Sequence, residues 1–294
     1  MKIDAHQHFW NPARGDYGWM PADNKILYRS YLPHDLEPYL KKLGIDKTIL
    51  VQAAPSIEET EYLLGIADSS AVVAGVVGWV NFEKATDYSQ LERLSKHPKF
   101  VGVRPMVQDI PDENWVLRDD IQWAFAAIRE MDLTFDALGF PKHLENFRKC
   151  LLKHKDMRTV IDHFMKPRIE NHSQDNFKFW ADGISALAED TSAYIKFSGL
   201  ITEASEDWTI DDLRPYVEHI FMKFGANRIL WGSDWPVCRL RAEYDAWHGT
   251  ASELTAHLSS DNKANVFGKN AIKAYKLLVK ENIFSISACK IFSR

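Results

Sequence analysis

Short apolar runs rich in β-branched residues recur along the chain, and amphipathic segments with helical spacing lie between them. Runs of the first kind predict buried strands, and their alternation with helices predicts βαβ units around a parallel sheet. Eight strands are expected, one within residues 1–10 and the others at Lys47–Ala53, Val72–Val80, Phe100–Arg104, Leu133–Leu138, Arg158–Phe164, Tyr194–Ser198 and Ile229–Asp234. Helices are expected at His34–Leu43, Ile57–Asp68, Asp87–His97, Asp119–Met131, His143–His154, Phe177–Glu189, Ile210–Phe224, Ala251–Leu258 and Asn265–Leu278.

Eight such strand and helix units are what a (β/α)₈ barrel requires, and barrels of this type commonly run to about 250 residues. A doubly wound open sheet is the competing architecture, but the phosphate-binding pattern G-x-G-x-x-G does not follow the first strand. The sequence has no Pro-, Gly- or Ser-rich linker that would divide the chain. We therefore predict a single α/β domain, a TIM-like barrel over residues 1–278, followed by a C-terminal tail at 279–294.

A long connection between the first strand and the first helix, Asn11–Pro33, departs from this regular spacing. It contains four breakers and several aromatic residues, among them Trp19. An excursion of about twenty residues inside a compact domain is usually functional or disordered. The aromatic content favours an ordered lid, although anchoring of these rings to the core would explain it equally well.

Composition and charge narrow the class of protein. The 294 residues are 46% hydrophobic and 26% charged, as in soluble globular proteins, and the formal net charge of −5 gives no electrostatic reason to expect a nucleic acid or an anionic membrane as a partner. The N-terminus lacks the apolar segment of a secretory signal, and the longest apolar run, Ala71–Val80, is too short to span a bilayer. Three widely separated cysteines, Cys150, Cys238 and Cys289, predict free thiols in a reducing, cytoplasmic setting.

Two imidazoles and a distant carboxylate are the first candidates for chemistry. His6 and His8 lie two residues apart in the first predicted strand, so their side chains share one face, with Asp4 behind them. The last predicted strand ends in Asp234. If the fold brings these two strand ends together, they form one polar site. The alternative is that each histidine is a hydrogen-bonded residue of the core or surface.

Catalytic groups of a (β/α)₈ barrel lie at the C-terminal ends of the strands, where the βα loops build the site. The polar or indole side chains at these ends are His6, His8, Gln52, Trp79, Asn81, Arg104, Asp136, His163, Lys196, Ser198 and Asp234. Gln52, Asn81 and Ser198 are most simply explained as polar residues facing solvent. Asp136 stands among apolar residues and must be solvated, paired or protonated, and we expect it at the substrate site.

His6, His8, His163 and Asp234 are donors that suit a borderline divalent ion such as zinc. A bound ion would lower the pKa of a water and polarise a carbonyl. Arg104 and Lys196 would place positive charge where a substrate oxygen becomes negative, unless they only form ion pairs with acids such as Asp136. Without metal, the Asp234 carboxylate could still accept a proton from water. The donor types therefore leave both routes open.

Five blocks of sequence resemble the amidohydrolase-2 branch of the amidohydrolase superfamily, and within it the sugar-lactone lactonases. The blocks are Asp4-Ala-His-Gln-His-Phe-Trp10, Asp162-His-Phe-Met-Lys-Pro167, Lys196-Phe-Ser-Gly199, Gly232-Ser-Asp-Trp-Pro236 and Phe267-Gly-Lys-Asn-Ala271. The similarity extends from residue 1 to about residue 278. His-x-His alone is a weak signal, whereas the five blocks in order are specific to the branch and less specific about the substrate.

The resemblance implies a distorted (β/α)₈ barrel that hydrolyses a cyclic ester. Asp234 would activate the attacking water as general base, and we expect Arg104, His163 and Lys196, or an ion held by His6 and His8, to stabilise the oxyanion. His6, His8 and Asp234 match the metal positions of the superfamily. Metal-dependent members usually carry a further ligand after strand four or five, where this chain has Arg104 and Asp136. The resemblance is therefore compatible with one bound divalent ion, such as zinc, and with catalysis without a metal.

The aromatic residues beside these motifs, Trp10, Trp19 and Trp235, are expected to contact the ring of a sugar lactone, together with Asp136. Two other functions are compatible with the same residues. One is a metal-dependent decarboxylase of the same branch, and the other is a barrel that binds a sugar acid without converting it. The sequence leaves the particular lactone and the assembly of the chain into a homo-oligomer undecided.

Overall fold

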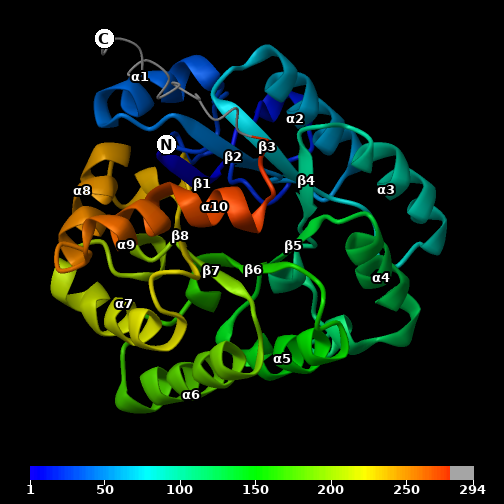
Figure 1. The fold of residues 1–294 in the computed structure, drawn as a ribbon. Helices are drawn as coiled ribbons and strands as arrows, with labels where there is room; N and C mark the ends of the chain where they lie inside the picture. The colour runs from blue at the N-terminus through cyan, green and yellow to red at the C-terminus, as the bar shows by residue number, and fades with distance from the viewer. Residues whose placement is uncertain (279–294) are drawn as a thin grey trace, which may run out of the picture.

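Eight parallel strands follow one another around a ring in the order of the sequence, with the larger helices outside it (Figure 1). The computed structural model describes residues 1–278, so the predicted tail at 279–294 and Cys289 lie outside the described residues. The strands are β1 (Ile3–Gln7), β2 (Lys47–Val51), β3 (Val73–Gly78), β4 (Phe100–Val103), β5 (Thr134–Ala137), β6 (Thr159–Ile161), β7 (Tyr194–Phe197) and β8 (Ile229–Trp231). The α-helices are α1 (Pro33–Leu43), α2 (Ile57–Ser69), α3 (Tyr88–Ser95), α4 (Gln122–Glu130), α5 (Leu144–Lys153), α6 (Gln174–Asp190), α7 (Ile210–Phe224), α8 (Tyr244–Leu254), α9 (Ser260–Ala264) and α10 (Asn270–Ala274).

The ring closes where β8 returns to β1. Gln7 and Trp235 form a parallel bridge, and the amide of His8 donates a hydrogen bond of 2.7 Å to the carbonyl oxygen of Trp235. The predicted single-domain (β/α)₈ barrel is therefore confirmed. This closure also brings the ends of the first and last strands side by side.

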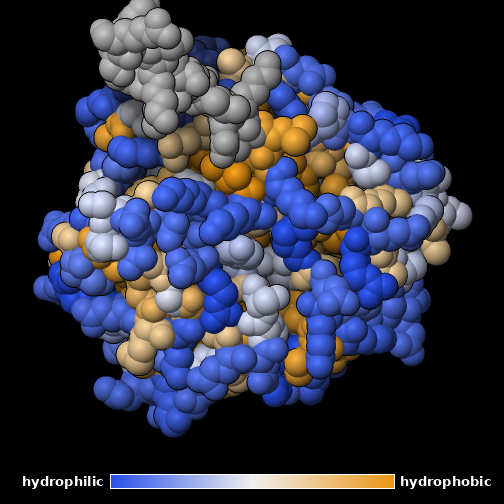
Figure 2. Space-filling model, viewed as in Figure 1, coloured by the Kyte–Doolittle hydropathy of each residue, from blue (hydrophilic) through white to orange (hydrophobic). Residues whose placement is uncertain are grey.

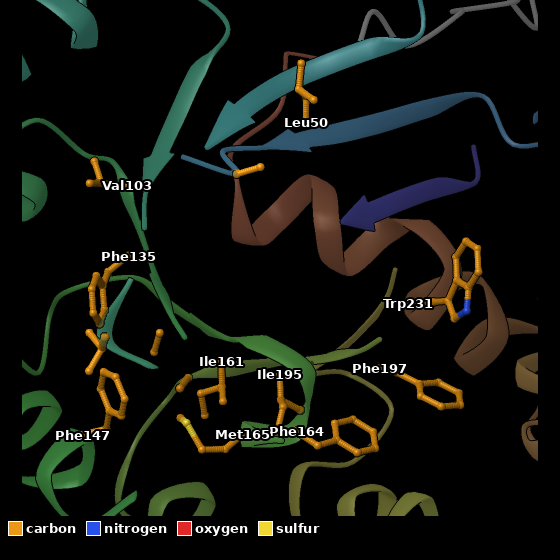
Figure 3. Close-up of a cluster of buried hydrophobic side chains, with 14 of the residues drawn as sticks. Leu50, Val103, Phe135, Phe147, Ile161, Phe164, Met165, Ile195, Phe197 and Trp231 are labelled. Carbon is orange, nitrogen blue, oxygen red and sulfur yellow. The ribbon is translucent and has the colours of Figure 1, made fainter. Parts of the chain in front are cut away.

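Hydrophobic side chains lie on both sides of the ring of strands. In Figure 3 the labelled side chains of β4, β5, β7 and β8 point away from the ring, toward the surrounding helices, where they join the large cluster between strands and helices. A second cluster fills the interior and includes Ile3, Ile49, Val77, Val160 and Leu230. Successive strand residues point to opposite faces, so in β8 Ile229 and Trp231 join the outer cluster and Leu230 joins the inner one.

Helix α10 lies across the ring of strands in Figure 1. The Thr134 hydroxyl at the start of β5 donates a hydrogen bond of 2.7 Å to the carbonyl oxygen of Ala274, and Tyr275 and Leu277 belong to the interior cluster. Figure 2, in the same view, shows a mostly hydrophilic face with a hydrophobic area where the end of α10 meets β3. Since α10 closes the N-terminal mouth, the C-terminal mouth is left for a site.

The structure corrects several predicted boundaries. Helix α8 begins seven residues before the predicted Ala251 and ends at Leu254, because Tyr244 and Trp247 supply a buried face outside the predicted helix. Strand β6 ends at Ile161 instead of Phe164, since the chain turns into a left-handed conformation there. The helix predicted at Asn265–Leu278 is broken by a non-helical Gly268, where a Cβ would come within 2.2 Å of the Met1 carbonyl oxygen.

The connection between β1 and α1 is folded onto the barrel. Trp10 and Tyr31 form an antiparallel bridge, and the Trp10 indole donates to the carbonyl oxygens of Leu27 and Arg29 at 3.1 and 3.0 Å. Anchoring to the core thus explains the aromatic residues Trp10 and Tyr31 of this segment, which are fully buried. Trp19 is not anchored in this way and remains 43% exposed. Within residues 1–278 the helices are too short or too polar to cross a membrane, and Cys150 and Cys238 are free and buried.

Candidate active site

His6 and His8 converge at the end of β1, as the spacing predicts. Their Nε2 atoms lie 3.2 Å apart. The pairing register with β2 shifts between Asp4 and Gln7, so the simple alternation of the strand is interrupted there. Asp4 points toward the helix layer and accepts hydrogen bonds from the Ser233 amide at 2.8 Å and the Tyr244 hydroxyl at 3.0 Å. Burial raises the pKa of Asp4 to about 6 against the opposing effect of these bonds.

Asp234 lies beside this pair of imidazoles. Its Oδ1 atom is 3.6 Å from His6 Nε2 and 3.3 Å from His8 Nε2. The close approach depends on Gly232, where a Cβ atom would come within 2.7 Å of the His6 Cβ. The Nδ1 atom of His8 lies 2.7 Å from the carbonyl oxygen of Val51, which can only accept, so this nitrogen carries the proton. The other ring nitrogen of His8, Nε2, faces Asp234.

His163 reaches the same carboxylate from the turn that follows β6, with Nε2 at 3.9 Å from Asp234 Oδ1. Its Nδ1 atom forms a hydrogen bond of 2.8 Å with the Ser198 hydroxyl, so Ser198 orients the ring instead of facing solvent. Gly199, at a φ of +66°, passes beneath the ring, and a Cβ there would come within 2.5 Å of His163 Nδ1. Burial lowers the pKa of His163 to about 4, so the imidazole is neutral at pH 7.

Four consecutive residues after β6, from His163 to Lys166, have positive φ angles of 52°, 51°, 59° and 50°. A left-handed residue other than glycine costs roughly 1–2 kcal/mol, and such residues normally occur singly. Buried packing holds this run in place, since Phe164 stacks on Phe197 and its carbonyl oxygen accepts a 2.7 Å bond from Trp180. The run turns both His163 and Lys166 toward the mouth of the barrel.

Asp234 remains ionised in this setting. Burial would raise the pKa of its carboxyl group, but the neighbouring imidazoles of His163, His8 and His6 hold that pKa below its ordinary value. The carboxylate is 5% exposed and has positive φ, a conformation that aspartate tolerates better than most residues. The arrangement provides a charged proton acceptor at the edge of a mostly buried site.

Below the imidazoles lies a group of fully buried charges. Lys196 Nζ donates to Asp136 Oδ2 at 2.6 Å, lies 2.9 Å from Asp162 Oδ1, and approaches His6 Nδ1 at 3.0 Å. Burial raises the pKa of Asp162, but the opposing charge of Lys196 dominates and holds it well below its ordinary value. Burial raises the pKa of Asp136 to about 6, with Lys196 opposing. The hydroxyl of Tyr275, the residue directly after α10, donates a hydrogen bond of 2.8 Å to Asp136.

The structure therefore places Lys196 and Asp136 in the barrel interior, although we expected both beside the substrate. Neither residue lines the cavity at the mouth. Both are buried where water is excluded, and there each compensates the charge of the other. Arg104 does line that cavity, and its guanidinium bridges the layers by donating to Asp162 Oδ2 at 3.1 Å and to the Gln52 carbonyl oxygen. Asp162 was missed as a site residue despite its position beside His163.

A cavity of about 130 Å³ opens directly above these groups. It is lined by His8, Trp10, Trp19, Ala53, Arg104, Met106, Gln108, Asp109, Leu138, His163, Lys166, Asp234 and Val237. Trp10 and Trp19 thus lie where we expected them, but Trp235 does not line the cavity and instead packs edge-on against Tyr31. Gln108 and Lys166 were missed because both lie beyond the predicted strand ends, in loops that periodicity does not describe.

The sequence profile of the amidohydrolase family matches residues 3–277, which is nearly the whole chain. This chain belongs to the amidohydrolase family. As a member, it is a hydrolytic enzyme, and the cluster of His6, His8, His163 and Asp234 at the mouth of the barrel is its candidate active site.

Two curated relatives of this amidohydrolase are L-fucono-1,5-lactonases. The one from Burkholderia ambifaria is 39% identical over 94% of this chain and 96% of the relative. The one from Burkholderia multivorans is 31% identical over the same shares. A crystal structure of an amidohydrolase from Burkholderia multivorans with bound zinc is also 31% identical and superposes with a TM-score of 0.88 over 94% of this chain and 99% of that chain.

The side chains of this amidohydrolase fit a divalent ion. His6, His163 and Asp234 are buried and each places one ligand atom within 4.8 Å of the others. Two imidazoles and a carboxylate are zinc donors, and three protein ligands leave a fourth position for water, as in catalytic zinc sites. This set contains three of the four predicted donors, and the fourth, His8, also places its Nε2 atom 3.3 Å from Asp234.

Proposed function

We propose that this amidohydrolase opens the cyclic ester of a sugar lactone by attack of water, with Asp234 as general base. The observation that carries the proposal is the convergence of three imidazoles on one ionised carboxylate at the mouth of a small cavity. The two L-fucono-1,5-lactonases support the substrate class, since both match almost the full length of the chain.

The first step is the attack of water on the ester carbonyl. Asp234 accepts a proton from the water as the bond between the water oxygen and the carbonyl carbon forms. The low pKa keeps Asp234 in the ionised form that this step needs. The imidazole of His8, held by the Val51 carbonyl oxygen with its Nε2 toward Asp234, can form a hydrogen bond to the water and so orient it.

The negative charge that develops on the carbonyl oxygen requires donors at the cavity wall. Arg104 supplies a permanent positive charge there, and the Nε atom of its guanidinium has no hydrogen-bond partner among the described residues. His163 can donate from Nε2 when Ser198 donates to Nδ1. Lys196 would act on this step indirectly, because its ammonium contacts His6 and does not reach the cavity.

The second step breaks the bond between the carbonyl carbon and the ring oxygen. Asp234, now protonated, returns its proton to this oxygen as it leaves, so that a hydroxy acid is released and the carboxylate is regenerated. Trp10 and Trp19 form an aromatic wall of the cavity, with their ring centroids 5.7 Å apart in an edge-on arrangement. Such a wall can pack against the apolar face of a sugar ring.

A divalent metal is part of the proposal, and His6, His163 and Asp234 are the residues that would hold it. When bound, such an ion polarises a carbonyl and lowers the pKa of a coordinated water. The zinc-containing relative supports its presence in this fold. The residues of this chain hold the donors in place in either case, since His8 is fixed by Val51 and His163 by Ser198.

The test is hydrolysis of a panel of aldonolactones that includes L-fucono-1,5-lactone, followed by acid release and measured with and without a chelator. The Asp234→Asn variant gives the background, because 1,5-lactones also open spontaneously. We expect the wild type to exceed this background by at least about a hundredfold on one lactone. Loss of that rate with the chelator and its return with zinc would assign the ion a role in turnover.

Two outcomes would replace this proposal with the alternatives considered above. Decarboxylation of an aromatic acid by the zinc-loaded protein, without any lactone hydrolysis, would establish a decarboxylase. Tight binding of a lactone without hydrolysis would establish a sugar-acid-binding barrel. Acid release at the rate of the Asp234→Asn variant on every lactone would exclude the lactonase.

A further inference from the structure

Lys166 stands at the cavity without a close partner. Its side chain is 19% exposed, and its ion pair with Glu203 is long, at 3.8 Å between Nζ and Oε1. Within residues 1–278, no side chain or carbonyl oxygen accepts a hydrogen bond from this ammonium group. An ammonium has three donors, so the partly exposed Nζ can donate to oxygen atoms of a ligand in the cavity beside it.

Gln108, in another loop, offers a hydrogen-bond acceptor where Lys166 offers donors. It lies in the short 3₁₀ helix Val107–Asp109 that follows β4, and it lines the same cavity. Its Oε1 atom is buried and lacks a hydrogen-bond partner among the described residues. A buried acceptor of this kind is costly unless a ligand donates to it. Two loops therefore hold one unsatisfied donor group and one unsatisfied acceptor at the same cavity.

The backbone at Lys166 indicates that its position is not incidental. Lys166 ends the run of four left-handed residues that begins at His163, and it is followed directly by Pro167. A simple link from β6 to α6 would not need this conformation, which persists only where the surrounding packing enforces it. The same run places both His163 and Lys166 along the cavity. Substrate binding and catalysis thus share one rigid turn.

We propose that Lys166 and Gln108 recognise the hydroxyl groups of the substrate ring. A hydroxyl both donates and accepts, so it can satisfy the Gln108 oxygen and the Lys166 ammonium together. An anionic substituent would pair with Lys166 but leave the Gln108 acceptor unsatisfied, in a cavity that already contains the carboxylates of Asp109 and Asp234. The inference rests on the proposed function and narrows its substrate to polyhydroxylated, uncharged lactones.

The test compares a hydroxylated ligand with one that lacks hydroxyl groups. L-Fucono-1,5-lactam and δ-valerolactam, which resist hydrolysis, are titrated into the wild type and the variants Lys166→Met and Gln108→Leu. We expect the wild type to prefer the hydroxylated lactam, and each substitution to weaken its binding about tenfold or more while changing δ-valerolactam binding by less than about twofold. Lys178→Met, at an exposed lysine of α6, is the matched control.

A second variant keeps the result interpretable if Lys166→Met folds poorly. Lys166→Gly removes the same ammonium and suits the positive φ at this position, so its thermal midpoint should equal or exceed that of the wild type. In turnover, Lys166→Met and Lys166→Gly should lose kcat/KM on L-fucono-1,5-lactone chiefly through a higher KM, and this loss should exceed their loss on δ-valerolactone.

The inference is overturned if folded Lys166→Met and Lys166→Gly bind L-fucono-1,5-lactam as tightly as the wild type, or if they lose both lactams equally. A wild type that binds the hydroxylated lactam through Lys166 but hydrolyses no lactone would refute the proposed function and support this inference. Because the lactams report binding without turnover, the two failures are distinguishable.

Discussion

The backbone amide of Asp234 donates a hydrogen bond of 2.8 Å to the carbonyl oxygen of His6. This bond joins the chain after β8 to the end of β1. A second bond, from the His8 amide to the Trp235 carbonyl oxygen at 2.7 Å, reinforces it. It sets the carboxylate of Asp234 beside the imidazoles of His6 and His8. The closure of the ring and the assembly of the site are therefore the same event.

Asp234→Asn should abolish lactone hydrolysis without unfolding the protein. The amide has the size of the carboxylate but cannot accept the proton of water, so kcat/KM should fall by at least about a hundredfold. Steady-state kinetics and a thermal melt check the two parts of this prediction. Asp211→Asn, at an exposed residue of α7, is the control and should keep the wild-type rate. An Asp234→Asn variant with more than a tenth of the wild-type rate would contradict the assigned role.

Trp19→Ala should weaken substrate binding. The Trp19 indole lines the cavity and is fixed by a bond of 2.7 Å to the Ala53 carbonyl oxygen. Its removal should raise KM about tenfold and change kcat less, because the wall contacts the substrate away from the reacting atoms. Tyr28→Ala, at a similarly exposed aromatic residue of the same connection, serves as the control. An unchanged KM would exclude this wall from the binding site.

Lys196→Met should destabilise the fold strongly. The substitution leaves Asp136 and Asp162 in the barrel interior without the ammonium that compensates them. Breaking a buried ion pair in this way costs about 3–5 kcal/mol in free energy of unfolding. Urea unfolding of Lys196→Met and of the double variant Lys196→Met/Asp136→Leu measures the effect. The double variant should recover part of the loss, and a single variant as stable as the wild type would show that the pair is not needed.

Glu59→Gln should make stability less dependent on pH. Burial raises the pKa of Glu59 from 4.5 to about 8, against the lowering effect of its bond from the Ala53 amide. Between these two values the unfolded chain has released a proton that the folded protein retains, so the free energy of unfolding falls as pH rises, by at most about 1.4 kcal/mol per pH unit. Below pH 4.5 the carboxyl group is neutral in both states and this loss is absent.

The glutamine variant cannot ionise and can still accept the bond from Ala53. Its stability relative to the wild type should therefore increase from pH 5 to pH 8, as measured by urea unfolding at each pH. Glu58→Gln, one residue earlier on α2 and exposed, should show no such trend. A constant difference between Glu59→Gln and the wild type across this range would mean that Glu59 does not change its protonation on folding.

The architecture and the two strand ends that form the site follow from the local pattern of the sequence. Strand periodicity is local, so the eight strands could be predicted and His6 and His8 assigned to one face. The barrel rule then placed these residues and Asp234 at one mouth, where the structure brings them within 3.6 Å of one another. The boundaries of α8 and of the last helix were wrong because buried aromatic contacts and a close backbone approach decide them.

Tertiary structure alone decided the direction of the remaining side chains. Lys196 and Asp136 look like site residues in the sequence, but the closed ring turns both into the interior, where each neutralises the other. Lys166 became a cavity residue through four left-handed backbone conformations that no local preference favours and that the packing of Phe164 and Met165 imposes. The physical reason is the distance along the sequence over which each property is set. The alternation of side chains along a strand depends on adjacent residues, whereas charge compensation and backbone strain depend on contacts made across the closed barrel.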